Sequence, residues 1–314
     1  MTPGTWLPRV SVVMPAYNTE RYIAAAVCSA LHAGEPQIEV LVVDDGSTDG
    51  TVAEVRAIGD RRVIVIETSR SGGPARPRNI GMARARAPYV SMLDSDDLLK
   101  PGKLAASVAA LDRNPSSGFA FGDYERIDAQ DKLLEASVLH GYPTFCVLPS
   151  IELQDSWRLI PQSVLAGGLL HENFIGTSGV VIRTDLARSL GGFDETLTCS
   201  EDRDMWFRLA HCCDALYLPQ IGHSYRKHES SLTQRPSMRC TLSQITVLRR
   251  EKARWRDRAS RRQLDRRIAE HLAGIGYGRR EQRQRWAAVW AFSRAFLTSP
   301  ELRWIRGLLG SLAR

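Results

Sequence analysis

Two carboxylates near the middle of the N-terminal half could hold a metal ion. Asp94 and Asp96 stand two residues apart in MLDSDD, at the end of an apolar run. Side chains two apart on an extended segment point to the same face, so both could bind one divalent cation. Oxygen ligands suit Mg²⁺ or Mn²⁺, with ligand phosphates and water completing the coordination. The alternative is that DSDD only caps a helix beginning near Leu98, for which one aspartate would suffice.

Alternating strands and helices are predicted to position these acids. Short apolar, β-branched runs predict strands, and the segments between them have helical periodicity. The predicted strands are 10–14, 38–43, 63–66 and 89–93, and the predicted helices are 21–32, 49–58 and 77–86. Strands that are apolar on both faces and alternate with helices form a parallel sheet covered on both sides. We therefore predict an α/β fold with a doubly wound, mostly parallel sheet.

Three of the predicted strands end in unusual residues. They are PAYN at 15–18, the pair Asp44 and Asp45 in VVDDGSTDG, and DSDD at 94–97. Ligands of such sheets bind beyond the carboxyl ends of the strands, so all three should border one crevice. An aromatic ring and several carboxylates suit a nucleobase, a ribose and a metal-bound phosphate. The chain has neither GxGxxG nor GxxxxGKS/T, so a bound phosphate would need a cation instead of a glycine-rich loop.

The composition is that of a globular protein. Its 314 residues are 43% hydrophobic and 25% charged, which is typical of a chain with a substantial core. The six cysteines form no CxxC pair, so we expect them to be reduced and the protein to be cytoplasmic. No apolar run approaches the ~18 to 20 residues of a membrane span, and residues 1–9 lack a hydrophobic signal region. We therefore expect neither a spanning helix nor a secretory signal.

Positive charge is concentrated in the C-terminal quarter. The formal net charge is +7, yet residues 239–314 hold about 19 Lys and Arg against about six acids, which leaves the first 238 residues acidic. We therefore predict two parts, 1–238 and a basic helical extension at 239–314.

Seven segments together resemble the motifs of the inverting family 2 glycosyltransferases, which have the GT-A fold. In chain order they are VSVVMPAYN, VVDDGSTDG, PRNIG, MLDSDD, GGFDETL, SEDRDMWFRL and YRKHESSLT, and they cover roughly residues 9–235. The resemblance implies a catalytic domain at 1–238, with a donor-binding half at about 9–125 and an acceptor-side half at about 126–238. It implies metal-dependent, inverting transfer of a sugar from a nucleotide donor, with a UDP-sugar favoured, to a saccharide or lipid-linked acceptor in cell-envelope or exopolysaccharide biosynthesis.

Two other functions are alternatives to this one. A sugar-1-phosphate nucleotidyltransferase needs a glycine-rich basic loop after the first strand, where this chain has PAYNTE. A protein that binds a nucleotide sugar without catalysis would not need a base in its pocket.

By this resemblance the first strand ends bind the donor nucleotide. Tyr17, beside Pro15, would stack on uracil, and Asp45 would accept the N3 hydrogen of the base, while Asp44 supports the turn. Arg78 of PRNIG would lie near the base and the phosphates. The alternative for Arg78 is a charge on a helix surface.

The resemblance also assigns the metal ligands. Asp94 would lie nearer the ribose, with Ser95 beside the nucleotide sugar, and Asp96 would bind Mn²⁺ or Mg²⁺ directly. His228 matches a histidine that reaches back to the metal, on a segment that closes over the site; a surface or packed histidine is the alternative. Asp97 is expected to cap the following helix.

A carboxylate base is needed to deprotonate the acceptor hydroxyl as it attacks opposite the leaving diphosphate. In SEDRDMWFRL, residues 200–209, acids precede apolar residues at helical spacing, which predicts a helix beginning with acids. In the family the second residue of this Glu-Asp pair is the base, so Asp202 is the expected base and Glu201 an acceptor-binding or supporting residue. The alternative is that both acids only complement the helix dipole.

The remaining segments carry the predictions about partners. Acceptor-binding elements are expected in 127–170, where Trp157 is expected to be buried; stacking on a sugar ring is the alternative. In the tail, an apolar stripe beside arginines is formed by Leu302, Ile305, Leu309 and Leu312, so residues 239–314 could lie on an anionic membrane at its inner face. Packing on the catalytic domain, or on a second subunit in a homo-oligomer, is the alternative. No nucleic acid is expected, because no nucleic-acid-binding module accompanies the tail.

Overall fold

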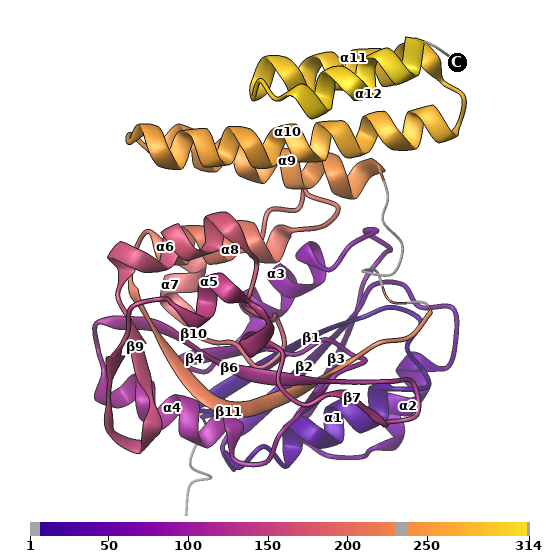
Figure 1. The fold of residues 1–314 in the computed structure, drawn as a ribbon. Helices are drawn as coiled ribbons and strands as arrows, with labels where there is room; N and C mark the ends of the chain where they lie inside the picture. Colours follow the sequence, from indigo (N-terminus) through magenta and orange to yellow (C-terminus); the bar gives the residue numbers. More distant parts are fainter. Residues whose placement is uncertain (1–6, 230, 232–237, 313–314) are drawn as a thin grey trace, which may run out of the picture. The chain divides into compact units, whose positions relative to one another are not determined.

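The computed structural model describes residues 7–229, 231 and 238–312. The chain divides into two compact units. The first comprises Met1–Thr196 and Glu201–Ser231, and the second comprises Leu197–Ser200 and Leu232–Arg314. Figure 1 shows a sheet with helices on both faces in the first unit and helices alone in the second.

The first unit is built on a mixed sheet. The strands described are β1 (Val10–Ala16), β2 (Ile38–Asp44), β3 (Val63–Glu67), β4 (Tyr89–Met92), β5 (Leu98–Leu99), β6 (Ser117–Ile127), β7 (Leu133–Glu135), β8 (Ile151–Glu152), β9 (Arg158–Ile160), β10 (Val181–Arg183) and β11 (Asp214–Arg226). Their order is β3-β2-β1-β4-β10-β6-β11-β9-β8, with β5 beside β11 and β7 beside β6. Strands β3, β2, β1 and β4 are parallel, as are β6 and β11, whereas β10 runs antiparallel between β4 and β6. The predicted mostly parallel α/β sheet is confirmed.

Helices cover both faces of this sheet (Figure 1). They are α1 (Ile23–Leu31), α2 (Thr51–Ala57), α3 (Ala75–Arg84), α4 (Lys103–Arg113), α5 (Pro143–Cys146), α6 (Gln162–His171), α7 (Thr184–Ser189) and α8 (Glu201–Ala210). Helices α1 and α4 bury their apolar residues in one core with Val10, Val12 and Met14. Helix α3 packs against β1 from the other face, where a Cβ on Gly81 would lie 2.4 Å from Val13 Cγ1. This glycine lets α3, which carries Arg78, approach the sheet closely.

The sequence pattern located the elements before residue 94 well. Each predicted strand and helix there is present with ends within two residues of the prediction. Residues 127–170 form short pieces: β7, the 3₁₀ turns η1 (Leu139–Gly141) and η2 (Gln154–Ser156), α5, β8, β9 and most of α6. Trp157 lies between them with 2% of its surface exposed, as expected.

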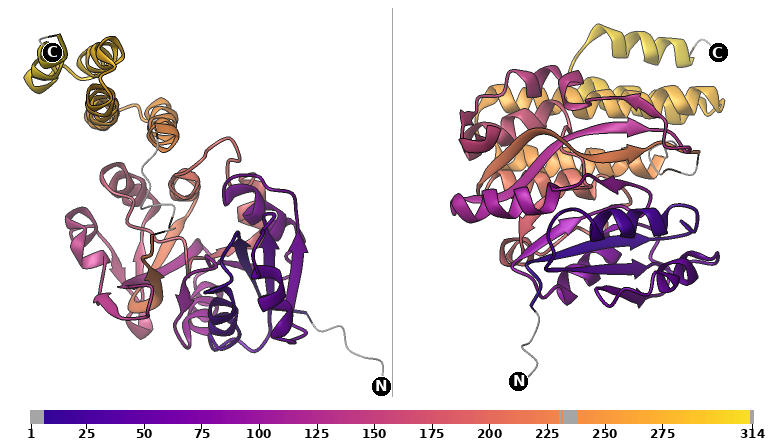
Figure 2. Two further views of the ribbon diagram at one scale, coloured as in Figure 1. Left: turned by 90° about the vertical axis from the view of Figure 1, so that its right-hand side faces the viewer. Right: turned by 90° about the horizontal axis from the view of Figure 1, so that it is seen from below.

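The second unit is helical, as predicted. It contains α9 (Met238–Arg254), α10 (Arg258–Glu281), α11 (Arg285–Thr298) and α12 (Leu302–Leu312). Asp257 caps α10, because its carboxylate accepts a hydrogen bond from the amide of Ser260 at 2.8 Å. Figure 2 (left) views these helices close to end-on and shows α10 between α9 and the pair α11 and α12. Among the residues described, no helix is long and apolar enough to cross a membrane, and Cys28, Cys146, Cys212 and Cys213 are free thiols.

Candidate active site

The candidate site lies at the carboxyl edge of the parallel strands. The register pairs Ala16 at the end of β1 with Asp44 at the end of β2. Strand β4 runs parallel on the other side of β1 and ends at Met92, next to Val13. The loops that follow these three strands therefore leave the sheet at the same edge, as the strand pattern predicted.

Tyr17 and Asp45 meet at this edge, but a third residue lies between them. The Asp45 carboxylate is buried and accepts hydrogen bonds from the amides of Ser71 at 2.8 Å and Gly72 at 3.3 Å. It also pairs with the guanidinium of Arg70. The same guanidinium lies 3.5 Å from the centroid of the Tyr17 ring, which is 40% exposed. Arg70 thus covers the Tyr17 ring face and the Asp45 carboxylate oxygen that a nucleobase would contact, and it belongs to none of the predicted motifs.

Other predicted residues of this edge have structural contacts. Pro15 is buried within β1, and Ser95 is buried after β4. The Asp44 carboxylate accepts a hydrogen bond from the amide of Ser47 at 3.0 Å, which closes the turn after β2. Its second oxygen is buried and has no hydrogen-bond partner among the residues described.

Arg78 joins two of the predicted acidic motifs. Its Nη2 donates to Asp94 Oδ1 at 2.6 Å and its Nη1 donates to Glu201 Oε1 at 2.6 Å. Only 3% of Arg78 is exposed, so the alternative of a helix-surface charge is wrong. Burial opposes the charge on this guanidinium, but the carboxylates of Asp94 and Glu201 outweigh burial and raise its pKa.

Burial shifts the acids around Arg78 toward their neutral forms. The pKa of Asp94 is raised by burial and by the nearby carboxylates of Asp96 and Asp202, against the lowering effect of Arg78. The pKa of Glu201 is raised by burial and by Asp202, again against Arg78. Asp94, Glu201 and Asp202 therefore form one electrostatically linked group, although Asp94 is about a hundred residues from the other two in the sequence.

The predicted helix cap at Asp97 is wrong. Residues Leu98–Leu99 form β5 and pair with Ser224 and His223 of β11, and the next helix begins only at Lys103. The buried Asp97 carboxylate instead accepts the hydroxyl of Ser178 at 2.6 Å and the amide of Arg226 at 2.9 Å. Asp97 fastens the DSDD turn to two distant segments, and burial together with Asp96 and Asp94 raises its pKa.

Asp202 stands in the first turn of α8, with donors around its carboxylate. Its Oδ2 accepts hydrogen bonds from Asn173 Nδ2 at 3.1 Å and from Thr177 Oγ1 at 3.5 Å. Its Oδ1 accepts the amide of Arg203 at 2.6 Å. A negative charge at a helix N-terminus explains only the contact with the Arg203 amide, because Asn173 and Thr177 belong to another segment. Asn173 and Thr177 lie in an irregular stretch in which the sequence offered no periodicity to assign single residues.

His228 and Asp96 lie in direct contact. His228 Nε2 is 2.8 Å from Asp96 Oδ2, and its ring centroid is 4.9 Å from that of Tyr22. Residues 230 and 232–233 of the segment predicted to close over the site lie outside the described residues. Among those described, no group of three or more His, Cys, Asp or Glu converges as a metal cluster. One carboxylate oxygen and one imidazole nitrogen nevertheless fit Mn²⁺ or Mg²⁺, which fill their remaining positions with phosphate and water.

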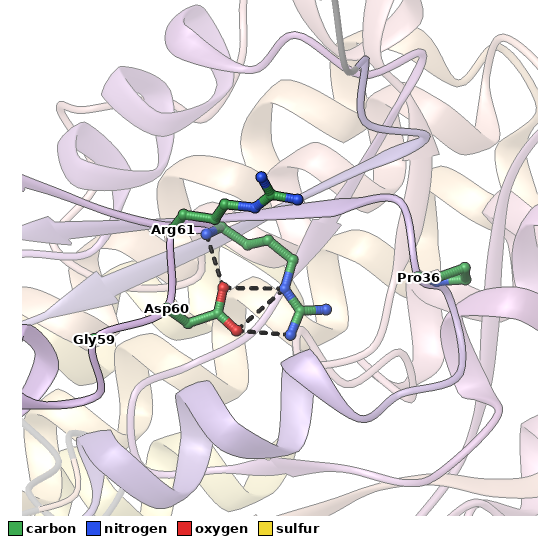
Figure 3. A pocket seen from close by; sticks show the side chains of 5 residues that line it. Pro36, Gly59, Asp60 and Arg61 are labelled. Atoms are coloured by element: carbon green, nitrogen blue, oxygen red, sulfur yellow. Dashed lines mark hydrogen bonds and ion pairs between the residues drawn. The ribbon is translucent and has the colours of Figure 1, made fainter. Parts of the chain in front are cut away.

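A separate pocket lies at the amino edge of the sheet. Pro36 and residues 59–62 line it, just before β2 and β3 begin (Figure 3). Asp60 and Arg62 are paired there, with 2.7 Å between Oδ2 and Nη2, and this pairing lowers the pKa of Asp60 to about 2. The two charges neutralise each other, and the pocket contains none of the predicted site residues.

Comparison with known proteins agrees with this geometry. Residues 11–147, which include Tyr17, Asp45, Arg78, Asp94 and Asp96, match glycosyl transferase family 2. The chain contains a family 2 glycosyltransferase domain. It is 42% identical over 229 residues to the succinoglycan biosynthesis protein ExoO of Rhizobium meliloti, covering 73% of this chain and 63% of that protein. It is 33% identical over 207 residues to a glycosyltransferase of Rickettsia bellii described as uncharacterized, covering 66% of this chain and 28% of the relative.

The chain thus spans less than two thirds of the length of each of these two relatives. Among solved structures, TarS of S. aureus in complex with UDP-GlcNAc matches with a TM-score of 0.66 at 19% identity, covering 93% of this chain and 82% of that one. The mannosyltransferase PcManGT of Pyrobaculum calidifontis, in complex with GDP-Man and Mn²⁺, matches with a TM-score of 0.59 at 19% identity, covering 98% and 81%. At this identity the likeness shows the fold, which is the GT-A fold expected from the motifs.

Proposed function

We propose that the protein is a metal-dependent, inverting glycosyltransferase that moves a sugar from a nucleotide sugar, with a UDP-sugar favoured, to a saccharide or lipid-linked acceptor. The observation that carries this proposal is the contact of Arg78 with both Asp94 and Glu201, which joins the DSDD turn to the first turn of α8. The donor-binding residues and the acceptor-binding residues would then lie next to each other. The relative named for succinoglycan biosynthesis supports a role in cell-envelope or exopolysaccharide biosynthesis.

The donor would bind to residues about 9–125. Tyr17 would stack on the base beside Pro15, and Asp45 would accept the N3 hydrogen of uracil. Asp94 would lie nearest the ribose, with Ser95 beside the nucleotide sugar. Arg78 holds Asp94 in place and keeps a positive charge close to the diphosphate.

Asp96 and His228, with Asp94 nearby, would hold Mn²⁺ or Mg²⁺. A divalent ion held by these residues would supply positive charge that stabilises the leaving diphosphate. This arrangement would make a separate general acid unnecessary.

The acceptor would enter from the side formed by residues 126–238, where Asp202 would act as the base. Asn173 and Thr177 donate hydrogen bonds to one oxygen of its carboxylate, which orients the group. Asp202 would remove the proton of the acceptor hydroxyl as the oxygen attacks the anomeric carbon opposite the diphosphate. Attack from that face inverts the anomeric centre. Glu201 supports this geometry through Arg78.

We also propose a cytoplasmic protein that lies on the inner face of a membrane through residues 239–314. The basic composition of that extension supports this location. No nucleic-acid partner is proposed, and a homo-oligomer would be compatible with the same extension.

The experiment that tests the proposal is nucleotide release from a panel of UDP-, GDP- and dTDP-sugars with Mn²⁺ or Mg²⁺. The intact protein should turn over one donor only when a divalent ion is present. Asp96→Ala should abolish turnover, and Asp202→Asn should lower kcat by roughly 10² to 10⁴ while donor affinity is kept.

Asp185→Asn is the matched control, because Asp185 is an exposed acid in the first turn of α7. It should leave kcat unchanged, since a helix N-terminal charge has no catalytic task there. Equal loss in Asp185→Asn and Asp202→Asn would reject the base assignment. Tight donor binding without turnover, across a broad set of acceptors, would favour a nucleotide-sugar-binding protein instead.

A further inference from the structure

The helices of the second unit pack tightly on their inner sides. The Phe292 ring of α11 lies against glycines of both neighbouring helices: a Cβ on Gly276 of α10 would lie 2.9 Å from it, and one on Gly307 of α12 would lie 2.5 Å from it. Tyr277 meets the same ring edge-on at a centroid distance of 4.9 Å. The inner face of α11 is therefore filled by α10 and α12.

The opposite side of α11 carries large apolar side chains in contact with solvent. Trp286 is 73% exposed, Trp290 is 59% exposed and Leu297 is 77% exposed. Spacings of four and seven residues place these three on one side of the helix. On α12, Leu302 and Leu309 are exposed with the same seven-residue spacing. We call these five residues the tryptophan face.

Only cations accompany the tryptophan face on its two helices. Between their bounds, α11 and α12 contain four arginines and no acid. The Arg285 guanidinium is 5.8 Å from the centroid of the Trp286 ring, and that of Arg294 is 5.5 Å from the Trp290 ring. Within the part of the chain that the structure describes, Arg294 and Arg306 take part in no ion pair. Large apolar side chains with unpaired cations beside them match the boundary between acyl chains and anionic headgroups.

A second copy of the chain fits this face less well. In a two-fold symmetric dimer the same patch meets itself, so the arginines of one copy would approach those of the other. No acid on α11 or α12 could offset that repulsion. Anionic phospholipids instead complement the charge, and tryptophan favours the membrane interface because its ring is apolar and its indole N–H is polar.

We propose that α11 and α12 bind the surface of an anionic phospholipid membrane through the tryptophan face. Trp286 and Trp290 enter the headgroup region, and Arg294 and Arg306 contact lipid phosphates. This deepens the peripheral location proposed above and rests on it, but it does not depend on which sugar is transferred. It keeps the chain on the surface where a lipid-linked acceptor resides.

The test is co-sedimentation of the full chain with vesicles of phosphatidylcholine, with and without phosphatidylglycerol, in the absence of any sugar donor. The intact protein should bind the anionic vesicles and show a blue shift of tryptophan fluorescence. Trp286→Ala combined with Trp290→Ala should lower binding at least about tenfold, because two interfacial side chains are lost. Arg294→Glu combined with Arg306→Glu should lower binding to anionic vesicles by a similar factor and abolish the dependence on phosphatidylglycerol.

Leu133→Ala combined with Leu134→Ala is the matched control, since both leucines are about half exposed in the first unit. This variant should bind vesicles like the intact protein. Light scattering of the intact protein and the double tryptophan variant measures the competing outcome. Equal vesicle binding by the intact protein and the double tryptophan variant would overturn the proposal. A dimer of the intact protein that dissociates when the tryptophans are replaced would also overturn it. Because no donor is present, a failure of glycosyl transfer leaves this result unaffected.

Discussion

Arg78 Nη1 lies 2.6 Å from Glu201 Oε1, although the two residues are 123 positions apart. With the second guanidinium nitrogen on Asp94, this contact ties the strand edge to the start of α8. The guanidinium is almost fully buried, so water cannot replace it if it is lost. Two carboxylates would then remain without their counter-charge.

We predict that Arg78→Met lowers the free energy of unfolding by about 3–5 kcal/mol at neutral pH, the cost of breaking a buried ion pair. The pKa of Asp94 and that of Glu201 are already raised by burial, and loss of Arg78 raises them further. A carboxyl whose pKa is higher in the folded state than in the unfolded state lowers the free energy of unfolding at a pH above the folded-state pKa. It has no such effect at a pH below the unfolded-state pKa. The loss should therefore be larger at about pH 7.5 than at about pH 4.5 in urea unfolding.

Arg62→Met is the control for this prediction. Arg62 is paired with Asp60, but both side chains are about one quarter exposed. Its loss should cost no more than about 1 kcal/mol. A comparable loss of unfolding free energy in Arg78→Met and Arg62→Met would show that the ion pairs of Arg78 contribute no more to stability than a surface ion pair does.

Arg70 provides the second prediction, because it lies over Tyr17 and pairs with Asp45. A nucleobase that stacks on the same face of Tyr17 and bonds to the Asp45 carboxylate must displace this guanidinium. Arg70→Ala removes the competitor, so uridine and UDP should bind up to about fivefold more tightly by calorimetry, the range of a partly exposed ion pair. Arg56→Ala, which breaks an exposed pair with Glu67, should not change affinity. Weaker binding by Arg70→Ala would instead show that Arg70 contacts the nucleotide.

The strand edge was predictable because it depends on local pattern. Alternation of apolar runs and helices places Tyr17, Asp45 and Asp94 after three parallel strands, and parallel strands end at one edge. The resemblance of motifs then assigned Asp202 and His228, which no local pattern relates to that edge. The contact between Arg78 and Glu201 needed the folded chain, because it depends on where α8 packs.

Long-range contacts explain the wrong prediction for Asp97 and the site residues that were not predicted. Asp97 was expected to cap a helix, but Leu98–Leu99 is drawn into the sheet by β11, more than a hundred residues later. Pro101 and Gly102 then delay the helix to Lys103. Arg70 and Asn173 lie in loops without periodicity, where side-chain direction is set by tertiary contacts and cannot be inferred from spacing.

The contact between His228 and Asp96 gives the third prediction. If both hold the metal, His228→Ala should raise the Mn²⁺ concentration needed for half-maximal turnover by at least about tenfold. His32→Ala is the control, because that exposed histidine follows α1, where its ring contacts the carbonyl of Cys28, and should have no effect. Free Mn²⁺ measured by electron paramagnetic resonance provides a readout without turnover. Unchanged Mn²⁺ affinity in His228→Ala would remove this residue from the metal site.

Lys103 gives the last prediction, since it is 3% exposed at the start of α4. Its Nζ donates to Ser107 Oγ at 2.9 Å, and burial lowers its pKa from 10.5 to about 7. The folded state therefore binds fewer protons than the unfolded state between these values, so stability rises with pH across that window. At or below pH 7 the full cost of burying the charge is present. Lys103→Met should accordingly stabilise the protein by a few kcal/mol, roughly, at about pH 6 and by less at about pH 9.

The neighbouring groups do not reverse this sign. Burial and the charges of Lys103 and Lys100 lower the pKa of His223 to about 3, so this imidazole stays neutral across the window. Lys100 is paired with Glu125 at 2.6 Å and is about one third exposed, so Lys100→Met should give no such gain. Urea unfolding of the three proteins at both pH values measures the difference. A gain in Lys103→Met that is the same at both pH values would mean that the buried ammonium keeps its ordinary pKa.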